Sequence, residues 1–258
     1  MKLSIVVPAY NEEARLAQML GVYLPYFGER YGEDFEIIVS VNGSVDRTEE
    51  IARGFRERHG QLRVIVDPGP IGKGGAIMAG GRVARGEKIG FVDADGSTPP
   101  EAFDELVRNI GDAGVIIASR WLPGARVSPR QPWKRRAASR VFNGLVRVLF
   151  KLRITDTQCG AKLMTAEAWR AIVPHIGLTR WAFDVDMLFQ TRRAHYRIVE
   201  IPTTWRDVAG SKIRIVRVSA QMFLAIVRLR MLYSRLRWVV ALYDRLLGRV
   251  IELPSEMR

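Results

Sequence analysis

Short apolar segments alternate with amphipathic ones along the first half of the chain. The apolar segments predict strands that are buried on both faces, at residues 3–7, 36–41, 62–66, 88–92 and 115–118. The segments between them repeat their apolar positions as helices do, at 11–27, 46–59, 73–84 and from Pro99 onward. Buried strands that alternate with helices are typical of a mostly parallel sheet with helices on both faces, so we predict the α/β class.

Polar residues follow three of these strands at the point where each strand ends. Tyr10 and Glu12 follow the first strand, Asn42 follows the second, and Asp93 and Asp95 follow the fourth. In sheets of this kind ligands bind at the carboxyl ends of the strands. We therefore expect these side chains to meet at a ligand site.

The segment 133–153 predicts a basic amphipathic helix. At about 100° per residue, one face carries Arg136, Arg140, Arg147 and Lys151. The opposite face carries Val141, Phe142, Leu145, Val148, Leu149 and Leu152. Such a helix suits the headgroup boundary of an anionic membrane, and it also suits a core-packing helix with a solvated face.

The tail at 213–253 is rich in aliphatic and aromatic residues, interrupted every few positions by arginine. Because these arginines point in different helical directions, two tandem interfacial helices and a hydrophobic dimer surface both fit. No segment reaches the roughly 18 uncharged apolar residues of a membrane span. We divide the chain into a domain at 1–212, which includes helix 133–153, and a basic, aliphatic C-terminal part at 213–258.

The chain of 258 residues carries 40 Lys and Arg against 27 Asp and Glu, a net charge of +13. Such a charge attracts nucleic acid, anionic lipid or phosphorylated substrates. The basic residues interleave with aliphatic runs, which favours an anionic membrane surface and leaves a nucleic-acid-binding protein as the alternative from another class. The single cysteine, Cys159, rules out an intramolecular disulfide.

Asp93 and Asp95 come directly after a buried strand, with one residue between them. Hard carboxylate oxygens in this arrangement can hold Mg²⁺ or Mn²⁺, which in turn bridges a diphosphate. The alternative is a solvated turn before the next helix. The glycine-rich segment 69–75 opens a helix, so its backbone N–H groups and Lys73 can face an anion.

Three segments resemble, in the same order, motifs of the family 2 glycosyltransferases, which have the GT-A fold. They are 5–12 (IVVPAYNE), 72–74 (GKG) and 92–95 (VDAD). The dolichyl-phosphate β-glucosyltransferase branch of that family is similar in four more, 156–162 (DTQCGAK), 180–186 (RWAFDVD), 205–207 (WRD) and 210–212 (GSK). The related dolichyl-phosphate mannose synthases share the architecture with different motifs.

The resemblance implies a metal-dependent, inverting hexosyltransferase whose catalytic GT-A domain is 1–212. The donor would be a nucleotide sugar, UDP-glucose before GDP-mannose, and the acceptor would be dolichyl or polyprenyl phosphate. The enzyme would work as a peripheral protein on the cytoplasmic face of a membrane, with Mg²⁺ or Mn²⁺ as cofactor. A homodimer or a separate membrane partner fits this picture. A family 2 enzyme with a soluble or glycan acceptor is the nearest alternative.

On the donor side, the resemblance implies that Pro8, Tyr10 and Glu12 frame the nucleotide. It also implies that Lys73 lies near the base or the diphosphate, and that the acidic pair after the fourth strand holds the metal and the donor. Lys212 matches the lysine of a loop that closes over the donor.

Further residues bear on the donor. The family usually has Asp-Asp-Gly-Ser-x-Asp after the second strand, where this chain has VNGSVD at 41–46. Asn42 can accept through its carbonyl oxygen and donate through its amide, which favours uracil over guanine. Asp184 or Asp186 would orient the donor sugar or a cation, and a solvated or capping role is the alternative.

On the acceptor side, Arg120 matches a segment near the acceptor phosphate, and Arg135, Arg136 and Arg140 match the first interfacial helix of the family. A lipid phosphate is already ionised near neutral pH, so a strong general base is less necessary than for a hydroxyl acceptor. A cluster of arginines would offset the repulsion between this phosphate and the donor diphosphate.

Overall fold

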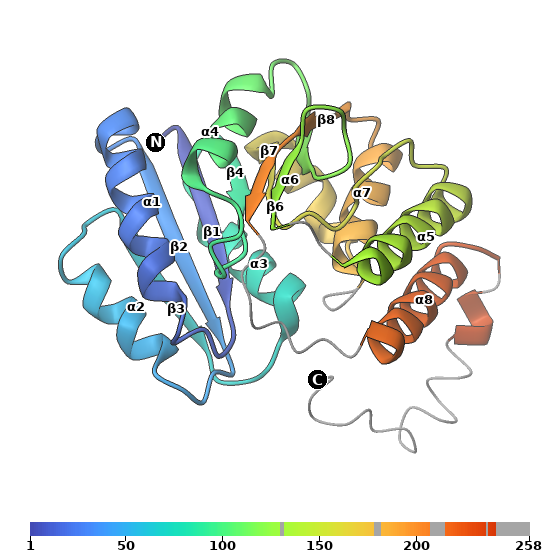
Figure 1. Ribbon diagram of the computed structural model, residues 1–258, viewed down its shortest axis with the longest axis horizontal. Coiled ribbons are helices and arrows are strands. Elements are labelled where there is room, and N and C mark those ends of the chain that lie inside the picture. Colours follow the sequence, from blue (N-terminus) through green and yellow to red (C-terminus); the bar gives the residue numbers. More distant parts are fainter. Residues whose placement is uncertain (130–131, 178–181, 207–214, 236, 241–258) are drawn as a thin grey trace.

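The computed structural model describes residues 1–129, 132–177, 182–206, 215–235 and 237–240, and a seven-stranded sheet forms its centre (Figure 1). The strand order is β3-β2-β1-β4-β7-β5-β8. These strands are β1 Leu3–Ala9, β2 Phe35–Asn42, β3 Leu62–Asp67, β4 Lys88–Phe91, β5 Val115–Ser119, β7 Lys162–Thr165 and β8 Ile198–Pro202. Only β7 runs antiparallel to its neighbours β4 and β5, which confirms the predicted mostly parallel sheet. Strands β6 Arg126–Ser128 and β9 Thr204–Arg206 pair separately.

Helices cover both faces of this sheet, as the pattern predicted. They are α1 Leu16–Tyr31, α2 Thr48–Arg56, α3 Gly72–Val83, α4 Pro100–Asn109, α5 Trp133–Phe150, α6 Ala166–Ile172, α7 Phe183–Arg193 and α8 Ile215–Leu232, with a 3-10 turn at Val173–His175. Helices α1, α2 and α4 contribute to the hydrophobic core on one face. Helices α3, α5, α6, α7 and α8 contribute to the core on the other.

Helix α3 lies unusually close to the sheet because glycines face it. A methyl group on Gly80 would come within 2.4 Å of the Val6 side chain, and one on Gly81 within 1.9 Å of Trp169. The glycines therefore let the helix backbone approach β1 and α6 directly. This close packing fixes the N-terminal end of α3, which carries Lys73, beside the carboxyl end of β1.

The apolar face predicted for helix 133–153 is wrong in part. The helix ends at Phe150, and its buried apolar residues are Phe142, Val146 and Phe150, one i, i+4 row. Val141 and Val148 were expected on the same face, but they are 64% and 77% exposed. Val141 directly precedes Phe142, so it points about 100° away from the buried row. Val148 comes two positions after Val146, so it points about 200° away. The helix thus presents both arginines and valines outward.

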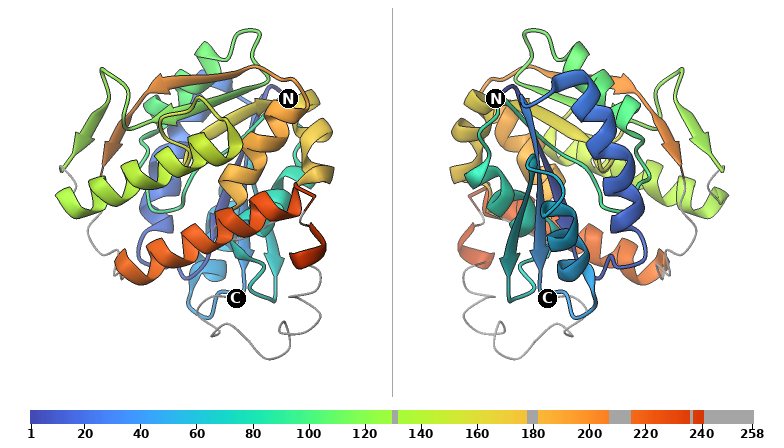
Figure 2. Two further views of the ribbon diagram at one scale, coloured as in Figure 1. Left: turned by 90° about the vertical axis from the view of Figure 1, so that its right-hand side faces the viewer. Right: turned by 90° about the vertical axis from the view of Figure 1, so that its left-hand side faces the viewer.

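Helix α8 packs beside α5 on the second face of the sheet (Figure 2). It buries Ile226 and Leu229, and after its end the Tyr233 hydroxyl donates to Asp186 on α7 over 2.9 Å. Among the described helices, none has both the length and the apolar character to cross a bilayer. The predicted division after residue 212 falls in 207–214, outside the described residues.

Candidate active site

The loops that follow β1 and β2 are held together by hydrogen bonds at the carboxyl edge of the sheet. The backbone N–H of Asn11 donates to Ser44 Oγ over 3.1 Å, and the Asn11 side chain accepts from the Val45 N–H over 3.0 Å. The Glu12 N–H donates to Thr48 Oγ1 over 2.7 Å. Helix α1 therefore begins at Leu16 and not at residue 11, because residues 11–15 form this turn, with Asn11 at a φ of 54°.

A glycine brings the β2 loop against the glycine-rich loop before α3. Gly43 has a φ of +62°, and a methyl group there would lie 2.8 Å from the backbone nitrogen of Pro70. Only glycine combines this left-handed conformation with so close an approach. The polar segments after β1 and β2 and the glycine-rich loop after β3 consequently lie next to one another.

Three residues expected on the donor side, Pro8, Tyr10 and Asn42, lie along this edge. Pro8 is half-buried and Tyr10 is 52% exposed. Asn42 is buried, and its amide donates to the Ala9 carbonyl over 3.1 Å. Among the described residues, none donates a hydrogen bond to the side-chain carbonyl oxygen of Asn42, Oδ1, so this oxygen can still accept one.

Glu12 is tied to the helix that follows it and feels the acidic pair. Its carboxylate accepts two hydrogen bonds of 2.7 Å from the Arg15 guanidinium. Burial raises the pKa of Glu12, Arg15 lowers it, and the negative charges of Asp95 and Asp93 raise it further, so the pKa lies above its ordinary value. The three carboxylates are therefore close enough to interact.

Lys73 and Asp93 form an ion pair at the centre of the site. Lys73 Nζ lies 2.6 Å from Asp93 Oδ1, and both side chains are half-buried. Burial raises the pKa of Asp93 more than Lys73 lowers it, and the neighbouring Asp95 raises it further. Burial lowers the pKa of Lys73, but the carboxylates of Asp93 and Asp184 more than offset this. Lys73 therefore stays charged between two acids.

Asp95 lies in a loop that several hydrogen bonds fix. Its Oδ1 accepts from the Ser97 N–H over 2.9 Å, a turn typical of aspartate. The Ser97 carbonyl accepts from the Arg206 N–H over 2.7 Å, and the Thr98 carbonyl accepts from the Tyr23 hydroxyl over 2.8 Å. The carboxylate is thus held beside Asp93 by contacts to α1 and β9.

The backbone of Gly160 lies directly against the carboxylate of Asp93. A methyl group at Gly160 would lie 2.0 Å from Asp93 Oδ2 and 2.5 Å from its Cγ. The carboxylate therefore rests directly on the backbone of the segment before β7. No larger residue fits there while Asp93 keeps its position.

A buried lysine on β7 holds Asp184. Lys162 is 0% exposed, and its Nζ lies 2.5 Å from Asp184 Oδ1 and 2.7 Å from the Cys159 carbonyl. Burial raises the pKa of Asp184, but Lys162 and Lys73 lower it more, so the pKa lies below its ordinary value. Asp184 is therefore an ionised, fixed carboxylate in the first turn of α7, and it is not solvated.

Arg120 is already paired. Its guanidinium donates to both oxygens of Asp156 over 2.8 and 3.0 Å, and Asp156 is fully buried. The same guanidinium lies 5.3 Å from the Trp205 ring centroid. Burial raises the pKa of Asp156, but the Arg120 charge and its hydrogen bonds hold it below the ordinary value. The charge of Asp93 also raises the pKa of Arg120, so the Arg120–Asp156 pair lies within electrostatic range of Asp93.

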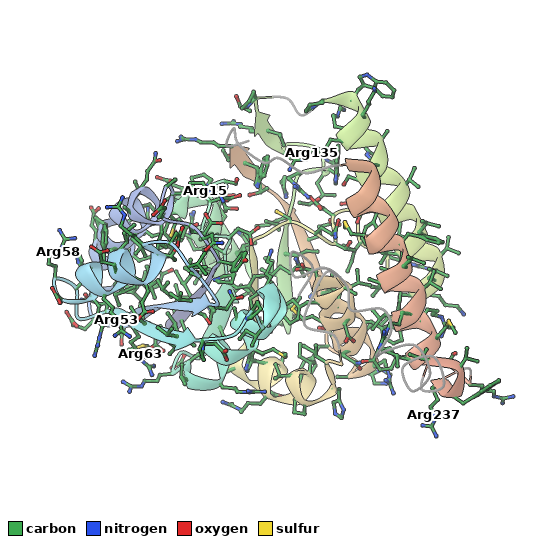
Figure 3. The ribbon with its side chains drawn as sticks, turned by 90° about the horizontal axis from the view of Figure 1, so that it is seen from below. Arg15, Arg53, Arg58, Arg63, Arg135 and Arg237 are labelled. Atoms are coloured by element: carbon green, nitrogen blue, oxygen red, sulfur yellow. The ribbon has the colours of Figure 1, made fainter. Side chains whose placement is uncertain are left out.

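The other predicted arginines lie on α5. The guanidinium carbons of Arg136 and Arg140 lie 6.0 and 4.7 Å from the centroid of the Trp121 ring. Figure 3 shows Arg135 near the start of α5, whereas Arg53 and Arg58 lie at the opposite rim. Lys212 lies outside the described residues.

The donor set at Asp93 and Asp95 fits a hard divalent cation. Mg²⁺ is usually bound by one or two carboxylates together with substrate phosphates, and Mn²⁺ prefers the same oxygen ligands. The described residues contain no group of three or more metal-ligating side chains. The neighbouring carboxylates of Asp93 and Asp95 together produce a negative potential, which suits a cation that arrives with a phosphate-bearing ligand.

Several residues of the site carried no role in the sequence analysis. They are Trp121, Asp156, Gly160 and Lys162. A lysine that opens the otherwise apolar strand 162–165 was a usable signal, since a buried lysine requires a carboxylate partner. Trp121 gave no such signal, because a single aromatic residue in a loop is usually a packing residue.

Comparison with protein families agrees with this geometry. The model of "Glycosyl transferase family 2" matches residues 4–172. A dolichyl-phosphate β-glucosyltransferase of Trichomonas vaginalis is 36% identical over 223 residues, covering 82% of this chain and 66% of that protein. The dolichyl-phosphate β-glucosyltransferases of Dictyostelium discoideum and Homo sapiens are 33% and 35% identical, over 92% and 82% of this chain and 76% and 69% of theirs.

Solved structures show the same fold at low sequence identity. Glucosyl-3-phosphoglycerate synthase from Mycobacterium tuberculosis, crystallised with Mn²⁺, UDP and glucosyl-3-phosphoglycerate, has a TM-score of 0.66 at 17% identity, over 90% of this chain and 78% of that one. TarS of S. aureus has a TM-score of 0.55 at 18% identity, over 91% and 66% of the two chains. These likenesses confirm the GT-A architecture.

Proposed function

Because this chain belongs to glycosyl transferase family 2, we propose that it transfers a hexose from a nucleotide sugar to dolichyl or polyprenyl phosphate with inversion at the anomeric carbon. One juxtaposition carries the proposal. The acidic pair with Lys73 lies within electrostatic range of the Arg120–Asp156 pair, and Trp121, whose ring Arg136 and Arg140 approach, follows Arg120 directly in the chain. A donor diphosphate and an acceptor phosphate would then meet between a cation site and an arginine cluster.

Asp93 and Asp95 would hold Mg²⁺ or Mn²⁺ on the donor side. When bound, the cation supplies charge neutralisation for the departing nucleoside diphosphate. Lys73 fixes the position of Asp93, and Asp184, fixed by Lys162, accepts hydrogen bonds from hydroxyl groups of the donor sugar. The side-chain carbonyl oxygen of Asn42, which accepts from no described residue, supports uracil as the base, and hence UDP-glucose before GDP-mannose.

The acceptor needs no strong base. A phosphate monoester is ionised near neutral pH, so one of its oxygens attacks the anomeric carbon while the bond from that carbon to the diphosphate oxygen breaks. No proton has to leave the nucleophile. The protein's task is to bring two anions together, and Arg136 and Arg140 supply positive charge where the acceptor phosphate lies.

Exposed apolar side chains on α5 and α8 support a lipid acceptor. Val141 and Val148 on α5 are exposed, and so are Phe223 and Leu224 on α8. Apolar side chains among arginines suit the headgroup boundary of an anionic membrane, where the protein would lie as a peripheral enzyme. A soluble acceptor would leave this surface without a use.

The test is transfer of radiolabel from UDP-glucose and, separately, GDP-mannose to polyprenyl phosphate in detergent, with Mg²⁺ or Mn²⁺ and with EDTA. We expect metal-dependent label in the lipid fraction, mainly from UDP-glucose. Asp95→Ala should abolish it, and Asp112→Ala, at an exposed pair with Arg197, is the matched surface control. Label only in a soluble product would refute the lipid acceptor.

A further inference from the structure

Trp121 occupies a position that stability alone does not explain. It follows Arg120 in the loop after β5, and its backbone N–H donates to Ser119 Oγ over 3.3 Å. Its indole Nε1 is buried and meets no acceptor among the residues that the structure describes. A buried donor without a partner costs folding free energy, so a native structure that keeps one calls for a reason other than packing.

The ring of Trp121 brings two like charges together. Arg136 and Arg140, one turn apart on α5, both direct their guanidinium groups at this ring. Cations four residues apart on a helix repel each other, whereas an indole face attracts guanidinium groups better than any other side-chain ring does. Within the described residues, neither guanidinium has a carboxylate partner.

The neighbouring arginine shows the contrast. Arg120 also stacks on a tryptophan, Trp205, but its charge is neutralised by the buried Asp156. The two arginines on Trp121 therefore carry positive charge that no carboxylate among the described residues neutralises. Two guanidinium groups held side by side match the several oxygens of a phosphate.

We propose that Trp121 is a positioning residue for the acceptor: its ring holds Arg136 and Arg140 side by side, so that both bind the phosphate of the lipid. This inference rests on the proposed function. Trp121 touches the arginines and not the reacting atoms, so its loss should change recognition of the acceptor and leave the donor side intact. The aromatic face carries the effect, and the unpartnered N–H does not.

Two variants separate the ring face from the bulk of the side chain. Trp121→Phe keeps an aromatic face and removes the buried N–H, so it should fold with equal or higher thermal stability and keep the KM for polyprenyl phosphate within about threefold. Trp121→Leu removes the face, so its KM for polyprenyl phosphate should rise about tenfold. For both variants the Kd for UDP should stay unchanged.

A matched control comes from the opposite rim of the molecule. Arg58 lies 4.9 Å from the ring of Phe55 on α2, and Figure 3 shows Arg58 far from α5. Phe55→Leu removes an equivalent cation–π contact and should leave the acceptor KM as in the wild type. Combining Trp121→Leu with Arg140→Met should add less than the sum of the two single effects, since both remove one arrangement.

The outcomes divide cleanly. Wild-type transfer to polyprenyl phosphate establishes the proposed function first, and its absence overturns that function before any variant is compared. Given that transfer, a raised acceptor KM in Trp121→Leu with rescue in Trp121→Phe supports the positioning role. An unchanged KM in Trp121→Leu, equal damage in both variants, or an equal loss of UDP affinity would overturn it.

Discussion

Gly160→Ala should displace Asp93 and so impair the acidic pair, although both carboxylates stay chemically unchanged. In Gly160→Ala the new Cβ would lie 2.0 Å from Asp93 Oδ2 and 2.5 Å from Asp93 Cγ. Ordinary carbon–oxygen contacts are about 3.3 Å, so the carboxylate has to retreat by more than about 1 Å. The backbone at Gly160 is outside the left-handed region, so alanine meets no conformational strain there.

The magnitude follows from that displacement. A misplacement of about 1 Å costs on the order of 10²-fold in rate, which is about 2.7 kcal/mol of transition-state stabilisation. The Lys73–Asp93 pair, 2.6 Å long, must also rearrange, and overpacking of this kind costs about 1–3 kcal/mol of folding stability. We therefore expect a folded but weakly active protein that binds Mn²⁺ less tightly in the presence of UDP.

The assay combines initial transfer rates, Mn²⁺ affinity with UDP bound, and urea unfolding. Gly54→Ala is the matched control, because Gly54 lies within α2 with nothing within 4 Å of an added methyl group. That variant should gain about 0.5–1 kcal/mol in stability and keep its activity. In an Asp93→Ala background, Gly160→Ala should cost little further stability. A wild-type rate and Mn²⁺ affinity in Gly160→Ala would refute the placement of Asp93 at the centre of the site.

Three further changes test the charges and turns that hold the site. Arg120→Ala leaves the buried Asp156 unpaired and should lower the free energy of unfolding at pH 7 by about 3–5 kcal/mol, by urea titration. In the wild type the pKa of Asp156 is depressed, so the ionised carboxylate stabilises the folded protein above the ordinary pKa near 3.9. This stabilisation is lost as the pH falls through the lower pKa of the folded state. The variant should instead regain folding stability as the pH falls. Lys162→Met should cost a similar amount through Asp184 and reduce the affinity for UDP-glucose relative to UDP, by calorimetry. Gly43→Ala, forced to a φ of +62°, should cost at least about 1–2 kcal/mol in the same unfolding assay.

The parallel half of the fold could be predicted from the sequence because its strands are apolar throughout. Strands β1 and β2 are buried along almost their whole length, so periodicity alone identified them. Strand β7 escaped prediction because it is short and begins with Lys162, whose burial depends on a carboxylate 22 positions later in the chain. Local patterns do not contain such non-local pairing.

The candidate site was predicted only as far as strand order allows. Because parallel strands end at one edge, the residues after β1 and β4 were expected to meet, and Glu12 does feel the charges of Asp93 and Asp95. Lys73, on the helix after β3, reaches the same edge and pairs with Asp93. The orientation of α5 could not follow from periodicity, since α8 and the second core decide which row is buried. The residue roles assigned from the resemblance, including that of Lys212, stay predictions.

The pairing of charges in this site explains why Arg136 and Arg140 have no carboxylate partner among the described residues. The fixed pairs are Lys73–Asp93, Lys162–Asp184 and Arg120–Asp156. Each is close to neutral, so each fixes geometry but adds little field to offset the repulsion between two phosphate-bearing substrates. At about 4 Å and an effective dielectric constant of about 20, that repulsion is roughly 4 kcal/mol for unit charges.

Among the side chains, only cations without a carboxylate partner can reduce this repulsion. Arg136 and Arg140 provide such charge if they are held in place by a group that does not neutralise them, and an aromatic face is a side-chain surface that attracts a guanidinium without cancelling its charge.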